Sequence, residues 1–414
     1  MIFANLIFVL SIPAAKAVSA THRQHPPSFL SSPRATSSFL SSRRRHARHS
    51  RPCTMAAPTV ELTWEAKGIT SSPTLPRSGH CAVTLPKGHE YDVLVFGGYT
   101  EDESLMEDRG PMGQVPKREV TNEGWLYSVD KDEWKQIAYE GDVPQPRLVA
   151  QTVVVDDKMW LIGGWNPSGA EGPSTILNDV WTLDLNTYKW SSHPGLQEQL
   201  QPISRFQAAV IGKKIYLHTH RSLDDILVID TQNETVEKLP ISSPSGASPP
   251  ASRGLHSMVA LDDRTLLIFG GAPQRGGFLN DVWTIDLQDN KWTDMTSKIE
   301  GQGPGPCCST AMVKVDNGVL MWGGAERPGQ EGEMEGLQPL DEAFLLRTDT
   351  DPWRWESVSV AGGADARPLP RNAHTMSLLP PREAGEMAEV VVHGGWWAFV
   401  KTYGDTFVGH LKAL

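Results

Sequence analysis

Six copies of one pattern divide the 414-residue chain into segments of similar design. In each copy an apolar stretch ends in two glycines or an equivalent pair, and these pairs begin at positions 97, 163, 219, 270, 323 and 394. The third pair is Thr219-His220 in place of two glycines. A repeat of about 50 residues is typical of solenoids and propellers, whose units need their neighbours to bury apolar surface. We therefore expect six similar units rather than one irregular core.

Two bulky apolar residues nine positions apart follow five of these stretches. The pairs are Trp125/Trp134, Trp181/Trp190, Trp283/Trp292 and, more loosely, Leu227/Val236 and Phe344/Trp353. The last copy begins at Phe407 without a partner, while residues 60–64 form an unmatched strand that ends in Trp64. The N-terminal strand is therefore expected to complete the last copy.

An arginine precedes the first strand of five copies. These arginines are Arg77, Arg147, Arg205, Arg253 and Arg371, and Cys307 stands at this place in the fifth copy. Arginine, diglycine strand and spaced bulky pair together resemble the kelch repeat over about residues 58–414. The resemblance implies an all-β fold, a six-bladed kelch β-propeller whose N-terminal strand closes the last blade. The expected blades are residues 77–140, 147–193, 205–240, 253–298, 306–359 and 371–414 with 58–67.

Strand parity predicts which loops share a face of such a fold. In an antiparallel four-stranded blade, the turns after strands two and four emerge on one side. The repeat arginines and the residues after the diglycines should therefore meet at the mouth of a central channel, where loops on a rigid scaffold carry function. The predicted partner-binding residues are Arg77, Tyr99, Arg147, Trp165, Arg205, Arg253, Arg371 and Trp396. The alternative is that the arginines only brace neighbouring blades.

Residues 1–54 differ in composition from the rest. Residues 1–60 contain eight bases and no Asp or Glu, and removing these charges from the net −11 leaves −19 on residues 61–414. An acidic body is a poor binder of nucleic acid or anionic membranes. The apolar run within residues 2–15 is too short to span a bilayer. Residues 1–54 are either a targeting peptide or a gene-model extension before Met55, which leaves residues 55–414 as the domain.

The four cysteines form neither a disulfide framework nor a zinc-binding spacing. They indicate a reducing compartment, so a cytoplasmic location is expected; the alternative is a plastid or the secretory route if residues 1–54 are a real leader.

Motifs for catalysis are absent from the sequence. No diglycine opens a helix, so there is neither a phosphate loop nor a nucleophile elbow. His218 and His220 with Asp224 or Asp225 offer metal-ligand types, but His218 aligns with packed strand positions. We therefore expect no catalytic residue, no metal and no cofactor.

The resemblance implies a non-catalytic scaffold or adaptor that binds another protein or peptide. Acidic residues in the 99–122 and 325–340 loops are compatible with a basic partner, and a monomer is expected. The alternative is a small-molecule binder similar to plant specifier proteins, which bind glucosinolate aglucones. Their Glu-x-x-x-Asp-x-x-x-His iron motif is missing here.

Overall fold

The computed structural model describes residues 59–68, 74–108, 114–167, 174–243, 248–327, 337–363, 366–380, 382, 385–398 and 400–414. The chain divides into Met1–Ala57 and Pro58–Leu414. The predicted leader therefore lies outside the described residues. In the described part, helix is limited to α2 (Pro194–Gln199) and the 3-10 turn η2 (Thr296–Lys298), and neither is long enough to cross a membrane.

Six sheets, numbered 1 to 6 in chain order, each contain four successively paired strands in the described residues. Sheet 1 contains β3 (Cys81–Thr84), β4 (Val93–Phe96), β7 (Gly124–Ser128) and β8 (Glu133–Gln136). Sheet 2 contains β9 (Gln151–Val155), β10 (Lys158–Asn166), β11 (Thr175–Asp184) and β12 (Trp190–Ser192). Sheet 3 contains β13 (Gln207–Ile211), β14 (Lys214–His218), β15 (Asp225–Asp230) and β16 (Thr235–Pro240).

The other three sheets repeat this design. Sheet 4 contains β18 (Ser257–Ala260), β19 (Thr265–Pro273), β20 (Leu279–Asp286) and β21 (Lys291–Asp294), with β17 (Arg253–Gly254) beside β19. Sheet 5 contains β22 (Ala311–Val315), β23 (Gly318–Trp322), β26 (Ala343–Arg347) and β27 (Arg354–Ser357). Sheet 6 contains β29 (Thr375–Leu379), β30 (Glu386–His393), β33 (Thr406–Ala413) and β1 (Val60–Lys67), with β28 (Ser359–Ala361) outside β1.

Three of the connections between second and third strands contain additional short antiparallel strands. Between β4 and β7 of sheet 1, β5 (Tyr99–Asp108) and β6 (Gln114–Val120) pair with each other and with β2 (Arg77–Ser78) as a separate three-stranded sheet. Sheets 5 and 6 carry smaller hairpins, β24 (Ala325–Glu326) with β25 (Gln338–Pro339) and β31 (Trp396–Trp397) with β32 (Lys401–Thr402).

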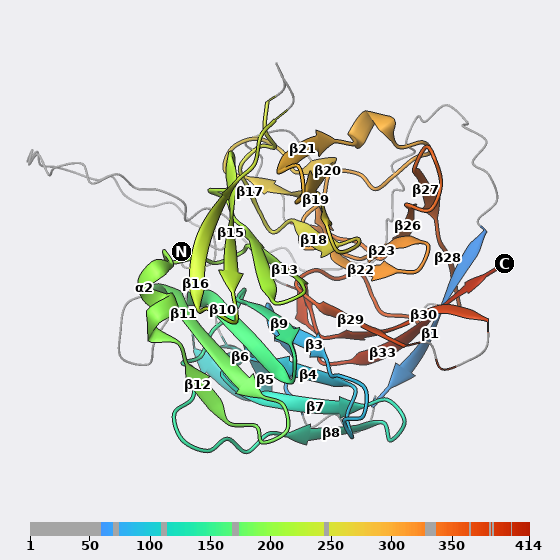
Figure 1. Cartoon of the computed structure of the whole chain (residues 1–414). Helices are drawn as coiled ribbons and strands as arrows, with labels where there is room; N and C mark the ends of the chain where they lie inside the picture. The colour runs from blue at the N-terminus through green and yellow to red at the C-terminus, as the bar shows by residue number, and fades with distance from the viewer. Residues whose placement is uncertain are drawn as a thin grey trace, which may run out of the picture. The chain divides into compact units, whose positions relative to one another are not determined.

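The first strand of each sheet contacts the first strand of the next. These contacts run from β3 to β9, β13, β18, β22 and β29, and β29 also contacts β3, as the arrangement in Figure 1 shows. Six clusters of buried apolar side chains lie between consecutive sheets, including one between sheets 6 and 1. A four-stranded sheet is too small to bury both of its faces alone, so each sheet depends on its neighbours for its core.

The N-terminal strand β1 is the fourth strand of sheet 6. It pairs antiparallel with β33 along its whole length, and Figure 1 shows this blue strand beside the red end of the chain. Trp64 lies 6.4 Å from Phe407 with the rings at 83°, the same edge-on packing as Trp181 with Trp190 at 6.5 Å and 89°. Trp64 therefore takes the predicted place of the missing tryptophan.

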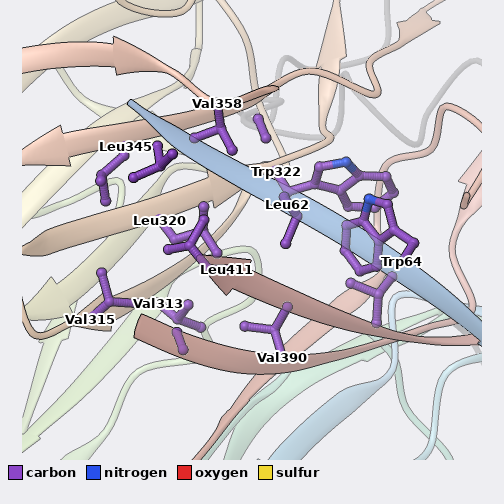
Figure 2. Close-up of a cluster of buried hydrophobic side chains, with 14 of the residues drawn as sticks. Leu62, Trp64, Val313, Val315, Leu320, Trp322, Leu345, Val358, Val390 and Leu411 are labelled. Atoms are coloured by element: carbon purple, nitrogen blue, oxygen red, sulfur yellow. The ribbon is translucent and has the colours of Figure 1, made fainter. Parts of the chain in front are cut away.

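Two further observations show that β1 makes the contacts of a fourth strand in the other sheets. β28, which leaves sheet 5, pairs parallel with β1, just as the segments leaving sheets 1, 3 and 4 pair parallel with the fourth strand of the next sheet. Leu62 and Trp64 pack among residues of sheets 5 and 6, as Figure 2 shows with Trp322 and Leu411.

The structure corrects one predicted aromatic pair. Phe344 packs edge-on against Trp355, at 6.4 Å and 84°, and not against Trp353. Leu346 stands opposite Trp355 just as Leu183 stands opposite Trp190. The connection between β26 and β27 is two residues longer than its counterparts, and this shifts the partner from the ninth to the eleventh following residue.

The sequence predicts that each diglycine ends a strand, and the structure shows that this is wrong for two sheets. β10 and β19 continue through their diglycines with a register shift at the first glycine. A Cβ on Gly164 would lie 2.8 Å from the Ala150 Cβ, and its φ of +106° also favours glycine. The pair is a bulge where the second strand passes close to the first, and the chain then continues into the loop.

Candidate functional site

Four repeat arginines are buried inside their own sheets. Arg77, Arg147, Arg253 and Arg371 are at most 1% exposed. Arg147 Nη1 donates to the Gly163 carbonyl oxygen at 2.9 Å, and the guanidinium forms two bonds to the Asp179 carboxylate, at 2.6 and 2.8 Å. Equivalent bonds join the other three arginines to the first glycine carbonyl of their sheet and to Asp281, Asp405 or Glu123.

The acidic partners were missed by the sequence reasoning, although a signal for them exists. Each acid stands two residues before the first bulky residue of its pair, as Asp179 does before Trp181. The Trp181 indole Nε1 donates to the same carboxylate at 2.8 Å, and Trp283 does so to Asp281 at 2.8 Å. In the four sheets that have a repeat arginine, an acid two positions before the bulky residue thus marks its ion-pair partner.

Neighbouring sheets are joined through the backbone at the arginine positions. The second glycine of a pair donates its N–H to the carbonyl at the arginine position of the next sheet, as Gly98 does to Arg147 at 2.8 Å. The same bond joins Gly164 to Ile203, Gly271 to Cys307, Gly324 to Arg371 and Gly395 to Arg77, each at 2.8 or 2.9 Å. Peptide groups, which any residue supplies, therefore link the sheets.

These findings correct the prediction for four of the candidate residues. With at most 1% of its surface exposed, the side chain of Arg77, Arg147, Arg253 or Arg371 presents nothing for a partner to contact. The bracing alternative describes them better, but they brace their own sheet rather than a neighbouring one.

Arg205 is not a repeat arginine. Ile203 holds that place in sheet 3, because its carbonyl accepts the Gly164 N–H and its own N–H bonds to Leu177. Arg205 lies two residues later with φ +57°, matching Gly79 at +63° and Val149 at +49° in other sheets. Sheet 3 therefore has no repeat arginine, and Arg205 matches the sequence pattern only in residue type.

Arg205 instead lines a central cavity of about 240 Å³. The first strands of all six sheets and the residues before them contribute to the lining. Besides histidines, Arg205 is the only lining residue with an ionisable cationic or carboxylate side chain. Its guanidinium lies 5.1 Å from the centre of the Trp165 ring, and no hydrogen bond or ion pair joins its side chain to another described residue. Burial lowers the pKa of Arg205.

The three predicted aromatic residues occupy equivalent places in sheets 6, 1 and 2. Tyr99 pairs with Ser78, Trp165 with Leu148 and Trp396 with Asn372, in each case the residue after a repeat arginine. All three side chains are half-buried. Trp165 Nε1 donates to Ser174 Oγ at 2.7 Å, which leaves its ring to stack with Arg205.

Exposed large apolar side chains gather on the same side of the sheets. Apart from Leu414, all of them in the described chain lie in segments after a second strand or before a first strand. They are Leu75, Leu105, Met106, Val143, Leu223, Leu369 and Val400. By the parity of antiparallel strands these segments share one face, which we call the loop face. The opposite turns, among the described residues, expose no large apolar side chain.

Five buried histidines surround the cavity. His80, His256 and His374 line it, and His218 and His393 lie on the adjoining second strands. His218 Nδ1 is 3.0 Å from His256 Nε2. Burial lowers the pKa of all five imidazoles, to about 3 for His218 and His374. They are therefore neutral packing residues at pH 7.

The three cysteines that the structure describes do not offer nucleophilic thiols. Burial raises the pKa of Cys81 and Cys308 to about 12 and that of Cys307 to about 11. Thiols with such pKa values stay protonated, and the thiolate is the reactive form.

Replacement of Arg147 tests the bracing role. Arg147→Ala is expected to lower the free energy of unfolding by about 3–5 kcal/mol, because it leaves the Asp179 carboxylate and the Gly163 carbonyl buried without their donor. Urea denaturation measures the loss, and Arg147→Ala with Asp179→Ala should recover part of it. An unchanged midpoint for Arg147→Ala would contradict the role.

Comparison with known proteins agrees with this architecture. A family model described as the KLHDC2/KLHL20/DRC7 Kelch-repeats domain matches residues 54–263 and 218–412. A leucine-zipper-like transcriptional regulator 1 homolog of Drosophila melanogaster is 24% identical over 272 residues, 64% of this chain and 26% of the relative. The flagellar outer-arm dynein alpha chain of Chlamydomonas reinhardtii is 30% identical over 286 residues, 68% of this chain and 5% of the relative.

A third similar protein is the tRNA wybutosine-synthesizing protein 2/3/4 of Arabidopsis thaliana, 31% identical over 159 residues, 37% of this chain and 14% of the relative. The chain thus spans about a quarter or less of the length of each of these three curated relatives.

Proposed function

Because the chain belongs to the KLHDC2/KLHL20/DRC7 Kelch-repeats domain family, we propose that it is a non-catalytic protein-interaction module that binds a segment of another protein on its loop face. Kelch repeats are commonly interaction domains, and function on such a fold resides in loops presented by a rigid scaffold. The observation that carries the proposal is that, apart from Leu414, the exposed large apolar side chains of the described residues gather on this face.

We further propose that the six sheets are the blades of a closed six-bladed ring. The circuit of contacts among the six first strands supports it, as does the pairing of β1 with β33. A closed ring removes free sheet edges and gives the loop face a constant shape.

Within the loop face, we assign contact with the partner to Trp165, Arg205, Tyr99 and Trp396, and support of their positions to the four buried arginines. Arg205 has no carboxylate of its own among the described residues, so an anionic group of the partner would complete it. An arginine stacked on tryptophan at the rim of a cavity is a frequent energetic centre of interfaces.

The stacked pair of Arg205 and Trp165 favours an anionic group on the partner rather than the basic partner expected from the sequence. The acidic residues of the β5–β6 hairpin are partly neutralised within it, since Glu101 Oε2 lies 3.0 Å from Arg118 Nε and accepts a hydrogen bond from Thr402. We therefore propose a partner segment that combines apolar side chains with at least one anionic group.

Two substitutions test the contact site without disturbing the fold. Arg205→Gly introduces the residue found at the equivalent Gly79, and Trp165→Ala introduces the residue found at the equivalent Ala325. Each is expected to weaken partner binding by roughly 1–3 kcal/mol, the range of an interface hot spot. Partners captured by the full chain and cross-linked to it provide the binding assay.

The control is Lys213→Ala, which alters an exposed lysine in a turn on the opposite face. Lys213→Ala should leave the affinity for the partner unchanged. In the unchanged protein, cross-links to the partner should involve Lys401 of the loop face rather than Lys213. Equal affinity of all three variants for the captured partner would overturn the assignment.

A further inference from the structure

A bulge in β30 turns two glutamates to the same side of sheet 6. Glu389 is three positions after Glu386, so a regular strand would point them to opposite faces. The pairing of β30 with β33 shifts register between Glu386 and Ala388, and His410 of β33 stands directly opposite Glu389. One ligand atom from each of Glu386, Glu389 and His410 lies within 4.8 Å of the others. Bulges re-aim side chains in this way.

The side chains of the three residues differ in solvent exposure. The side chains of Glu386, Glu389 and His410 are 0%, 2% and 21% exposed. Glu386 Oε1 lies 2.8 Å from His410 Nδ1. Glu389 Oε1 is buried and accepts no hydrogen bond from any described residue. Burying an ionised carboxylate oxygen without a hydrogen-bond donor costs folding free energy. A positively charged ligand at Glu389 Oε1 would offset that cost.

The nearest arginine satisfies Glu389 only in part. Arg382 Nε lies 3.4 Å from Glu389 Oε1. Its two terminal nitrogens donate to Asp130 and Asp92, each at 2.6 Å. One guanidinium charge is therefore shared among three carboxylates.

The other side of the cluster contains a lysine and a further glutamate. Lys412 Nζ lies 3.5 Å from Glu386 Oε1, and the lysine side chain is 42% exposed. Glu65 of β1 brings a further carboxylate, whose Oε2 lies 4.0 Å from His410 Nε2. Among the described residues, Glu65 is also paired with Lys67, whose Nζ lies 2.6 Å from Glu65 Oε1, so the uncompensated oxygen of the cluster is Glu389 Oε1.

We propose that Glu386, Glu389 and His410 bind a divalent transition-metal ion such as Zn²⁺ or Mn²⁺. Two carboxylate oxygens and one imidazole nitrogen are a donor set that these ions accept. The exposed part of His410 and the 55% exposed Glu65 side chain leave a path for the ion and a position for water. The ion would join β30 to β33 beside the N-terminal strand β1. This site differs from the loop face and was not predicted from the sequence.

The full chain titrated with each metal alone tests the proposal. We expect one Zn²⁺ per chain by isothermal calorimetry and one Mn²⁺ by electron paramagnetic resonance, the latter with nitrogen coupling from His410. Metal should also raise the thermal midpoint of unfolding, because a ligand that binds only the folded state stabilises it.

Two variants and one control locate the site. Glu389→Gln keeps the side-chain shape and should lower affinity at least tenfold, and His410→Gln should remove the nitrogen coupling. Glu237→Gln, an exposed acid on β16, should bind as the unchanged protein does. Histidines of residues 1–57 are present in every variant, so their contribution cancels. No saturable binding up to millimolar metal, or equal binding by Glu389→Gln, would overturn the proposal.

Discussion

Deletion of residues 55–66 is expected to leave a chain that no longer folds cooperatively. The deletion removes Val60, Leu62 and Trp64, which are 2%, 0% and 8% exposed, from the core between sheets 5 and 6. Loss of a single large core side chain typically costs about 3–5 kcal/mol, and whole domains are stable by only about 5–15 kcal/mol. The deletion also exposes the edge of β33, which invites aggregation. Circular dichroism and size-exclusion chromatography measure the outcome.

A graded variant and a relocation keep this prediction testable when the deletion protein is insoluble. Trp64→Ala should lower the free energy of unfolding by about 3–5 kcal/mol, whereas Val400→Ala, at a side chain that is 65% exposed, should change it little. Moving residues 58–68 behind Leu414 through a short turn should restore the fold, because Val60 pairs with Ala413. A deletion protein that melts like the full chain would refute the structural role of β1.

Acid should unfold this protein well before its carboxylates protonate. Five histidines are buried and neutral in the fold, with pKa values lowered by burial, to about 3 for His218 and His374. In the unfolded chain they take up protons below about pH 6.5, so acid favours the unfolded state. Each histidine removes at most about 1.4 kcal/mol of stability per pH unit below that point, on the order of 10 kcal/mol for all five by pH 5.

Urea denaturation between pH 7.5 and 5 measures this dependence. His218→Phe introduces the residue that the equivalent positions Phe96 and Phe269 already carry, and it should reduce the slope of stability against pH by the share of one histidine. Phe269→Leu serves as the control, because it lowers stability without removing a titrating group. Stability that stays flat from pH 7.5 to 5 would show that the imidazoles are not held neutral by burial.

The repeat, the place of Trp64 and the loop face were all readable from the sequence. They follow from local chemistry, since glycine pairs, strand parity and regular spacing constrain each copy independently. The equivalence of Tyr99, Trp165 and Trp396 was also readable, because each directly follows a diglycine and pairs with the residue after a repeat arginine.

Only the tertiary structure decided what the side chains at these positions do. A repeat arginine looks the same in one-letter code whether it meets solvent or an aspartate 32 residues later, and burial of Arg147 against Asp179 depends on how two strands pack. A two-residue offset hid the true place of Arg205 and Trp355, because backbone pairing and not residue type sets equivalence. The Glu386, Glu389 and His410 cluster depends on a bulge, and a register shift of one residue leaves no mark in the composition of a strand.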